Sequence, residues 1–429
     1  MPLPLEGIRI LDLSRIWAGP YATKLLADTG AEVIKLESLK GYDPHRGPLD
    51  PPPGSGNYPQ GEPGSAPWNR AGWFNALHMS KYGITLDLAQ PRGRDLFGQL
   101  VQVSDALIEN FRFGTLERLG LGYAKLRSLR PDIVVVSMPS FGNSGPWRSY
   151  IQYGIGQEQL AGMASMTGYL NGEPMRSGVN HGDPITGSHA AGILLAALLY
   201  RRRTGRGMFI DLSQQESAVC LIGEHLLGFQ MTGRNPASRG NRHPSMAPHG
   251  VYPCRGDDSW VTIAVSTDHE WRALCEALGC HDLLDDPRFA GPLARWHNQE
   301  ALDEVISAWT RERESQQVAE VLQLAGVPAA PVLTAPGLLS DPQYRERGVF
   351  VEATHPDAGT HLYPGIAWKM SRTPGQVRWA APRLGEHNHY ILGTLLGLGS
   401  DEILELEERQ IAGTVPVGAA KGQNNEKEA

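Results

Sequence analysis

Runs of strand length and runs of helix length alternate over residues 1–140, and this alternation constrains the fold more than any other feature of the sequence. Residues 7–14 form a short run with β-branched and apolar residues, residues 21–28 form a helical stretch that Gly30 ends, and residues 32–37 give a second strand. A strand, a short crossover helix and a strand make a right-handed βαβ unit, which belongs to a parallel sheet. The sequence therefore predicts an α/β fold.

The same pattern continues along the chain. We expect a helix over about 92–103, a strand over 106–110, a helix near 115–129 and a strand over 132–137. A long apolar helix is expected over 184–203. The basic residues at 201–203 indicate its C-terminus, because positive charges interact favourably with the negative end of the helix dipole. These elements extend the first unit into a larger parallel sheet covered by helices.

The character of the sequence changes at about residue 237. A turn at 255–258 precedes an apolar strand at 260–265, and a helix with one apolar face follows at 269–278. Gly279 stands where that helix should end. This part of the chain is predicted to form a second, smaller α+β domain.

Charge, hydropathy and cysteine placement argue against several classes of function. The 39 Lys and Arg residues are outnumbered by 46 Asp and Glu residues, for a net charge of −7. Neither nucleic acid nor a membrane surface is therefore expected as a partner. The longest dense apolar run, at 190–200, is too short to span a bilayer, and the N-terminus lacks the pattern of a signal peptide. The four cysteines form no C-x-x-C pair, so we expect no disulfide, no zinc and a reducing cytoplasm.

The common signatures of nucleotide and hydrolase sites are absent from the sequence. It contains no G-x-G-x-x-G, no P-loop, no G-x-S-x-G and no H-E-x-x-H. Its histidines are scattered rather than clustered, and no metal site is predicted. The sheet is therefore expected to bind a ligand without the familiar mononucleotide motifs.

The first candidate site is the segment 14–20, which follows the first strand. Ligands of open α/β sheets bind beyond the carboxyl ends of the strands, where the next helix offers unpaired N–H groups. Gly19 permits close approach of the backbone, and Pro20 suits a first helical turn. A tight turn with Trp17 packed in the core would explain the same residues, and local sequence leaves both interpretations open.

The second candidate is Asp183, which stands before Pro184 and the long apolar helix. Its simplest interpretation is an N-cap, whose loss would cost about 1 kcal/mol. A carboxylate at a helix N-terminus is also stabilised as the anion, so its pKa should be lowered and it could act as a nucleophile. Local sequence does not choose between a cap and a nucleophile.

The order of short motifs along nearly the whole chain resembles the family III CoA-transferases, the group that includes formyl-CoA transferase and carnitine CoA-transferase. The resemblance extends from Leu5 to about Ile411. Nine motifs in sequence order carry it: LEGIRILDLS at 5–14, AGP at 18–20, LADTGAEVIKLE at 26–37, ENF at 109–111, GV at 178–179 with Asp183, RTGRG at 203–207 with IDLS at 210–213, GNRHP at 240–244, AGVP at 325–328 and LGEH at 384–387.

The resemblance implies a reaction and its site residues. The family's nucleophilic aspartate falls on Asp183, which would form a mixed anhydride with the donor acyl group and then an aspartyl-CoA thioester. Ala18 would offer a backbone N–H near the thioester carbonyl. Coenzyme A thioester is then a substrate, and no tightly bound cofactor is expected. The residues that correspond to the family's CoA contacts are Arg15, Ile16, Leu77, Lys81, Asn110, Phe111 and Arg118.

Departures from the family pattern bear on the acid substrate. Trp17 stands where formyl-CoA transferase has glutamine, so a bulky or hydrophobic acid, including a dicarboxylic acid, is expected. Tyr153 is the other residue predicted to contact the substrate. The loop 47–68, rich in Pro and Gly, is expected to lie at the surface and to shape substrate entry.

The resemblance also implies a domain division and an oligomeric state. The large domain would be doubly wound and built from both chain ends, and the protein would be a homodimer of interlocked rings, although a heterodimer with a paralogue is possible. The predicted segments are the first part of the large domain at 1–205, a linker at 206–236, the small domain at 237–317, a linker at 318–335, the returning part of the large domain at 336–418 and a disordered tail at 419–429.

Two other functions are consistent with parts of the pattern. The α-methylacyl-CoA racemases resemble the same family, but they pair the aspartate with a histidine base, where this sequence has Gln-Tyr-Gly-Ile at 152–155. A non-catalytic acyl-CoA-binding subunit should have lost the nucleophile, yet Asp183 is present. Incubation of an acyl-CoA with a free acid separates the three, because only a transferase moves CoA between acids.

Overall fold

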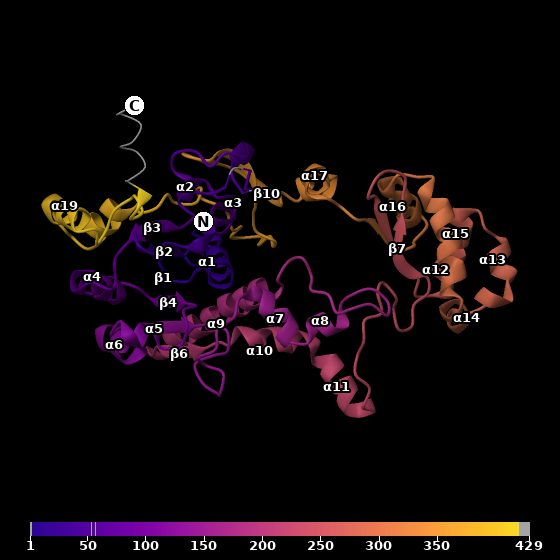
Figure 1. Ribbon diagram of the computed structural model, residues 1–429, viewed down its shortest axis with the longest axis horizontal. Helices are drawn as coiled ribbons and strands as arrows, with labels where there is room; N and C mark the ends of the chain where they lie inside the picture. Colours follow the sequence, from indigo (N-terminus) through magenta and orange to yellow (C-terminus); the bar gives the residue numbers. More distant parts are fainter. Residues whose placement is uncertain (1, 53, 56, 420–429) are drawn as a thin grey trace. The chain divides into compact units, whose positions relative to one another are not determined.

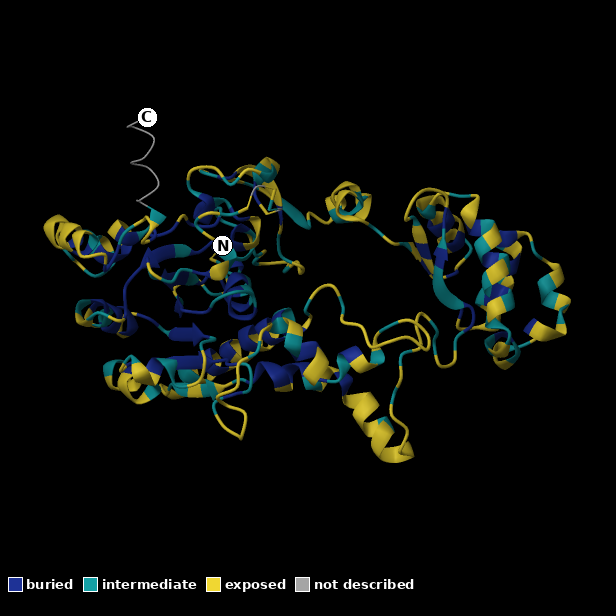
Figure 2. Ribbon diagram, viewed as in Figure 1, coloured by how far each residue is buried: buried dark blue, intermediate teal, exposed yellow. Residues whose placement is uncertain are grey.

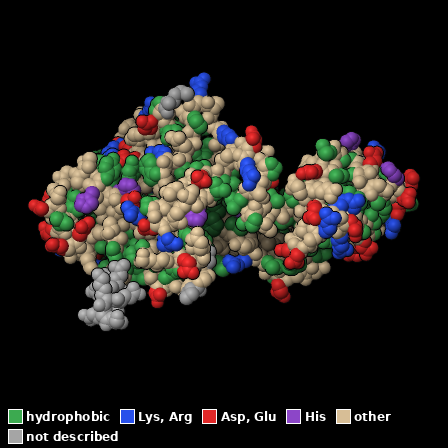
Figure 3. All heavy atoms as spheres, turned by 90° about the horizontal axis from the view of Figure 1, so that it is seen from above, with side chains coloured by type: hydrophobic (Ala, Val, Ile, Leu, Met, Phe, Trp, Pro, Cys, Tyr) green, Lys and Arg blue, Asp and Glu red, His purple; other side chains and the backbone are tan. Residues whose placement is uncertain are grey.

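The computed structural model describes residues 2–52, 54–55 and 57–419, and the chain divides into two compact units (Figure 1). The larger unit comprises 1–162, 177–227 and 347–429, and the smaller unit comprises 163–176 and 228–346. Residues 420–429 of the predicted tail lie outside the described residues. On the face shown in Figure 3, Lys and Arg side chains lie among Asp and Glu side chains in each unit.

The larger unit is built on a six-stranded parallel sheet of order β3-β2-β1-β4-β5-β6. Its strands are β1 (Arg9–Asp12), β2 (Glu32–Glu37), β3 (Tyr82–Thr85), β4 (Ala106–Glu109), β5 (Val134–Ser137) and β6 (Met208–Asp211). The predicted α/β class with a parallel sheet is confirmed. Strands β3 and β6, which lie at the two edges of the sheet, were not predicted.

Helices cover both faces of this sheet, because successive strand residues point to opposite sides. One core contains Ile10, Val33 and Ile108 and packs against α1 (Ala18–Asp28) and α9 (Gly182–Thr204). The other core packs against α4 (Pro91–Gln102), α6 (Tyr123–Leu129) and α19 (Ser400–Glu408). Figure 2 shows the inner strands of the sheet in dark blue, as buried, between these two layers.

The helix predicted over 115–129 is broken into α5 (Thr115–Arg118) and α6. The break lies at Gly120, whose φ of +72° ends the first segment. The other described elements of the larger unit are η1 (Pro44–Arg46), η2 (Pro59–Gly61), α2 (Pro67–Arg70), α3 (Gly72–Leu77), α7 (Gly154–Leu160), α10 (Gln214–Val219), η3 (Cys220–Ile222), β10 (Phe350–His355), β11 (Gly359–Pro364) and the π-helical turn η5 (His389–Leu395). Helix α11 (Gly223–Thr232) crosses the division between the units.

The strand order reverses between β1 and β4. From β1 the chain adds β2 and β3 on one side, and it then crosses to β4, β5 and β6 on the other. In open parallel sheets, such a reversal leaves a crevice at the carboxyl ends of the two central strands. The segment 14–18 follows β1 and the segment 110–113 follows β4, so the sheet topology brings these two predicted segments to one crevice.

The smaller unit has an antiparallel sheet of β7 (His249–Pro253), β8 (Trp260–Ala264) and β9 (Ala329–Pro331). Its helices are α8 (Met163–Met166), α12 (Asp268–Leu278), α13 (Asp282–Asp285), η4 (Pro287–Phe289), α14 (Pro292–His297), α15 (Gln299–Arg311), α16 (Ser315–Leu324), α17 (Ala335–Ser340) and α18 (Pro342–Glu346). The predicted linker at 318–335 is wrong. Val318 and Leu322 share one face of α16 and are buried in this unit's core, and β9 pairs with β8.

Candidate active site

A cavity of about 250 Å³ lies at the carboxyl ends of the central strands, within the larger unit. It brings Asp183 and Tyr153 together with four of the predicted CoA contacts. The residues that line it are Arg15, Ile16, Pro44, Asn110, Phe111, Arg112, Phe113, Pro139, Ser140, Arg148, Tyr150, Ile151, Gln152, Tyr153, Gly154, Gln157, Asp183 and Gln214.

Asp183 lies in the first turn of α9, and only 7% of its surface is exposed. Burial raises the pKa of Asp183 to about 6, while a hydrogen bond from the backbone N–H of Ala18 opposes that rise. The prediction of an N-cap with a lowered pKa is therefore wrong. His181 precedes the helix, no side chain caps it, and the loss of water around the carboxylate outweighs the helix dipole.

Bare glycine backbone packs directly against this carboxylate. A Cβ added to Gly154, at the start of α7, would lie 1.8 Å from Asp183 Oδ2. A Cβ added to Gly187 on α9 would lie 2.5 Å from the carbonyl oxygen of Ala18 on α1. These two glycines let α7, α9 and α1 approach closely enough to enclose Asp183.

Glu158 organises the segment that leads into α9. The residue is 2% exposed, and its carboxylate accepts hydrogen bonds from His181 N at 2.6 Å, Ser177 N at 3.1 Å and Ser177 Oγ at 2.8 Å. Burial acts to raise the pKa of Glu158, but these hydrogen bonds outweigh burial and lower it. Glu158 therefore stays ionised and fixes the backbone just before Asp183.

Asn110 holds the turn that joins β1 to α1. Its Oδ1 accepts from Arg15 N at 2.7 Å, and its Nδ2 donates to Arg15 O at 2.8 Å. The Arg15 guanidinium lies 5.8 Å from the centre of the Phe111 ring. Asn110 thus lines the cavity but uses both ends of its amide on protein backbone.

The prediction that Lys81 meets a CoA phosphate is wrong for this structure. Lys81 is 0% exposed, and its Nζ bonds Asp12 Oδ2 at 3.1 Å, Thr23 Oγ1 at 2.8 Å and Pro20 O at 3.0 Å. Burial lowers the pKa of Lys81 to about 8, although Asp12 opposes this. Lys81 therefore ties α1 to β1 from within the core rather than facing a ligand.

Four other predicted residues do not line the cavity, and one of them, Ala18, is buried and reaches Asp183 only through its backbone N–H. Leu77 ends α3 and is half-buried, and Trp17 precedes α1 and is half-buried. Arg118 is exposed on α5, where its guanidinium donates to Thr115 Oγ1 at 2.8 Å. The aromatic residues that do line the cavity are Phe111, Phe113, Tyr150 and Tyr153.

Sequence reasoning missed two arginines of the cavity, Arg112 and Arg148. Among the described residues, neither of them nor Arg15 forms an ion pair with a carboxylate. The Arg148 guanidinium lies 5.1 Å from the centre of the Phe113 ring. A cavity that combines three such cations with one buried carboxylate suits an anionic ligand. Only the fold could reveal this grouping, since Arg148 lies in a loop without periodicity.

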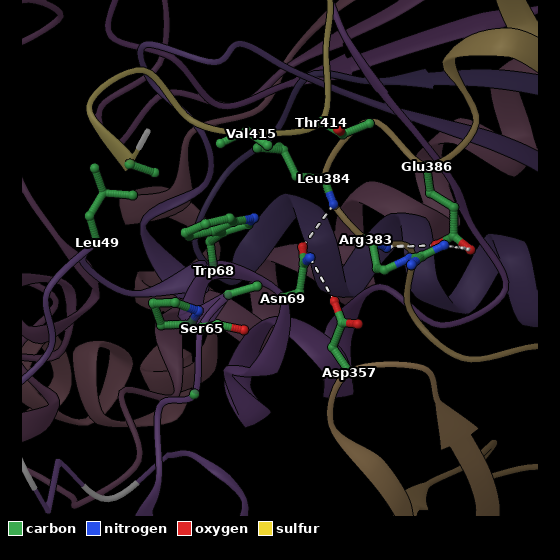
Figure 4. A pocket seen from close by; sticks show the side chains of 14 residues that line it. Leu49, Ser65, Trp68, Asn69, Asp357, Arg383, Leu384, Glu386, Thr414 and Val415 are labelled. Carbon is green, nitrogen blue, oxygen red and sulfur yellow. Dashed lines mark hydrogen bonds and ion pairs between the residues drawn. The ribbon is translucent and has the colours of Figure 1, made fainter. Parts of the chain in front are cut away.

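A larger cavity of about 950 Å³ lies elsewhere in the same unit (Figure 4). Trp68, Leu49 and Val415 form its apolar side, so part of the predicted surface loop 47–68 is packed against the C-terminal segment. Its polar side is paired internally, because Asn69 Nδ2 donates to Asp357 at 2.8 Å. The smaller cavity, with its unpaired cations, is the better candidate for chemistry. No cluster of His, Cys, Asp and Glu that could hold a metal occurs in the described part of the chain.

Comparison with known proteins identifies the family. The sequence pattern of CoA-transferase family III matches residues 5–388. The chain belongs to this family. Among the similar curated proteins, the succinyl-CoA–D-citramalate CoA-transferase of Chloroflexus aurantiacus is 36% identical over 96% of this chain and 98% of its own length. The succinate–glutarate CoA-transferase of Agrobacterium fabrum is 33% identical over 91% of this chain and 96% of its own length.

The family III fold is also found among solved structures. A CaiB/BaiF family protein from Brucella suis matches with a TM-score of 0.82 and 30% identity, over 92% of this chain and 100% of its own. The predictions of the family and of a CoA-transferase enzyme are confirmed. Among the described residues, we find no helix with the length and hydropathy to cross a bilayer.

Proposed function

We propose that this family III CoA-transferase moves CoA from an acyl-CoA donor to a free acid through a covalent aspartyl-CoA thioester on Asp183. The observation that carries the proposal is a buried carboxylate in the cavity, with the Ala18 N–H directed at it, and three arginines in the lining of the same cavity that form no ion pair among the described residues. Burial strips water from the carboxylate, which raises its reactivity toward a thioester carbonyl.

The proposed cycle needs no external proton or oxidant. Asp183 attacks the thioester carbonyl, the C–S bond breaks, and CoA thiolate leaves a mixed anhydride of the acyl group with the aspartate. The thiolate then attacks the Asp183 carbonyl carbon and releases the donor acid as its carboxylate. The acceptor carboxylate then attacks the carbonyl carbon of the Asp183 thioester, and CoA thiolate leaves a second mixed anhydride. The thiolate attacks the acyl carbon of the acceptor, which yields the acceptor's CoA thioester and frees Asp183. The Ala18 N–H would stabilise negative charge that develops on oxygen.

We propose that Arg15, Ile16 and Phe111 contact the CoA moiety, and that Tyr153 contacts the acid. All four line the cavity with Asp183. Arg15 can pair with a phosphate, and the Phe111 ring can face the adenine. The cavity does not support a substrate contact for four other predicted residues, because none of them lines it: Leu77, Lys81, Arg118 and Trp17.

The acceptor is proposed to be a dicarboxylic acid. Names of the similar enzymes include succinate, glutarate and D-citramalate, all with two carboxylates. One carboxylate would react at Asp183 while Arg148 or Arg112 pairs with the other.

Replacement of Arg148 by Gln tests the proposed second carboxylate site. The KM for succinate or glutarate should rise about tenfold or more, because a charge-assisted pair is lost, while the KM for a monocarboxylate of similar length changes little. Arg127→Gln, on the exposed side of α6, is the matched control. A rise in KM for the acyl-CoA alone would instead assign Arg148 to the CoA phosphates.

The covalent intermediate can be detected directly. The enzyme is incubated with succinyl-CoA, trapped with hydroxylamine or borohydride, digested and analysed by mass spectrometry. The peptide that carries Asp183 should be modified in the native enzyme and unmodified in Asp183→Asn. Exchange of CoA between acids with an unmodified peptide would contradict the proposal, and scrambling at the α-carbon without exchange would indicate a racemase.

We also propose that the protein is a homodimer, with a heterodimer as the alternative, and that it works in the cytoplasm. Helix α11 has no buried residue and exposes Leu226, Leu227, Phe229 and Met231, as Figure 2 shows in yellow. Helix α9 also exposes Leu195 and Leu199. Apolar surface of this extent is typical of a protein–protein interface.

A further inference from the structure

The turn between β1 and α1 has an unfavourable backbone conformation at the cavity. Ile16 has a φ of +68°, in the left-handed region that residues with a branched β-carbon avoid. Ile16 lines the cavity and stands two residues before Ala18, whose N–H donates to Asp183. Such a conformation persists only where the surrounding structure holds it.

Two charged side chains of the core hold this turn. Lys35, on β2, donates from Nζ to the carbonyl oxygen of Ser14. Asp43, in the segment after β2, accepts from Ile16 N at Oδ1 over 3.2 Å, and the same oxygen accepts from His45 N at 3.0 Å. Lys35 and Asp43 thus bind backbone groups on either side of Arg15.

Lys35 and Asp43 also form an ion pair, with Nζ 3.1 Å from Oδ2. Both side chains are 0% exposed, and neither lines the cavity. A buried ion pair adds little to net stability, because desolvation of the two charges offsets their attraction, whereas it does fix geometry. The geometry that this pair fixes is the turn that carries Ile16.

We propose that Lys35 and Asp43 are positioning residues for CoA transfer, which hold Ile16 in the left-handed conformation and so direct the Ala18 N–H at Asp183. This inference rests on the proposed role of Asp183 as the nucleophile. Neither residue touches the substrate, so their loss should slow the chemical step and leave substrate binding nearly unchanged.

Asp43→Asn is the principal test, because it keeps the size of the side chain and removes its charge. Asp28→Asn is the matched control, since Asp28 is also buried and paired with a lysine, Lys24, at 2.5 Å, but it lies at the opposite end of α1 from the turn. We expect kcat to fall about 10- to 100-fold in Asp43→Asn, with KM for the acyl-CoA within about threefold of the native value. In Asp28→Asn, kcat should stay within about twofold even if the protein unfolds at a lower temperature.

The pH profile gives a readout that a purely structural role would not change. Burial raises the pKa of Asp183 and the Ala18 N–H opposes it, so a displaced N–H should move the acid limb of kcat to higher pH. The charged groups that line the cavity beside Asp183 are Arg15, Arg112 and Arg148, and they remain in both variants. The acid limb of the kcat profile should move to higher pH in Asp43→Asn and should keep its native position in Asp28→Asn.

A rescue experiment tests the left-handed conformation itself. Glycine adopts positive φ freely, so Ile16→Gly added to Asp43→Asn should recover part of the lost kcat. If Asp43→Asn does not fold, Ile16→Pro takes its place, because proline fixes φ near −65° and removes the N–H while the ion pair stays intact. Ile16→Pro should then show the same fall in kcat and the same displaced limb.

Several results would overturn the inference. They are a native kcat in Asp43→Asn, an equal loss of kcat in Asp28→Asn, or a native kcat in Ile16→Pro. The Asp183→Asn variant separates this failure from failure of the proposed function. If Asp183→Asn still exchanges CoA, the nucleophile is wrong; if it is inactive while Asp43→Asn behaves as the native enzyme, only the positioning role is wrong.

Discussion

At the scale of single residues, the proposed chemistry depends on a carboxylate that the fold destabilises as the anion. The pKa of Asp183 is about 6 in the fold, against 3.8 for an ordinary aspartate, because burial removes water from the anion. The folded state therefore binds a proton more readily than the unfolded state. The group's contribution to stability becomes more favourable as the pH falls through about 6, and the ionised group destabilises the fold at neutral pH.

Asp183→Asn should be inactive and more stable than the native protein at pH 7. Each pKa unit corresponds to about 1.4 kcal/mol, so the free energy of unfolding should rise by up to about 3 kcal/mol. This reverses the expected loss of about 1 kcal/mol for a helix cap. Urea unfolding at pH 7 and pH 5 is the measurement. The gain should shrink at pH 5, and an equal gain at both values would argue against titration of Asp183.

The same pKa predicts the pH dependence of turnover. As the proposed nucleophile, Asp183 must be ionised, so kcat should fall as the pH drops through about 6, with one proton bound. A pH series of CoA exchange between succinyl-CoA and a second acid measures this. An acid limb centred near pH 4 would show that the carboxylate is hydrated in the working enzyme.

At the scale of elements, glycines decide how closely three helices approach Asp183. Gly187 lets α9 contact α1, and Gly154 at the start of α7 lies against the carboxylate itself. Glu158 on α7 fixes the segment before α9, because its carboxylate accepts hydrogen bonds from the backbone N–H groups of Ser177 and His181. The proposed nucleophile is thus positioned by backbone contacts between helices.

Gly154→Ala should therefore impair catalysis far more than stability. The added methyl group overlaps Asp183 Oδ2 and must displace the carboxylate. Because the displaced carboxylate is misaligned with the thioester, we expect kcat to fall about 100-fold. Gly192→Ala is the matched control on α9, because a Cβ there meets no atom within 4 Å. It should keep its activity and gain about 0.5–1 kcal/mol of helix stability. Equal activity in both variants would show that the contact does not position the carboxylate.

At the scale of the whole molecule, one chain contributes a doubly wound unit and a smaller antiparallel unit. The larger unit takes segments from both chain ends, with β10, β11 and α19 returning to it after the smaller unit. The candidate site lies entirely within the larger unit. Helix α9 exposes the apolar side chains of Leu195 and Leu199 on this unit, and they are the basis for the proposed dimer.

Leu195→Glu with Leu199→Glu on α9 should shift the protein from dimer to monomer, because two charges would be buried in an apolar interface. Light scattering coupled to size-exclusion chromatography measures the mass in solution. Leu404→Glu on α19, which is also exposed, is the control and should leave the mass unchanged. A native protein that is already monomeric would contradict the proposal.

The sequence by itself determined the parallel α/β class, the family and Asp183 as the residue to examine. Periodicity and motif order are local properties, so they can be read along the chain. The tertiary structure alone decided the raised pKa of Asp183, the burial of Lys81 and the grouping of Arg112 and Arg148 with Arg15. Dehydration of a carboxylate, exposure of a lysine and proximity of cations depend on which distant segments meet, and local sequence contains no record of that.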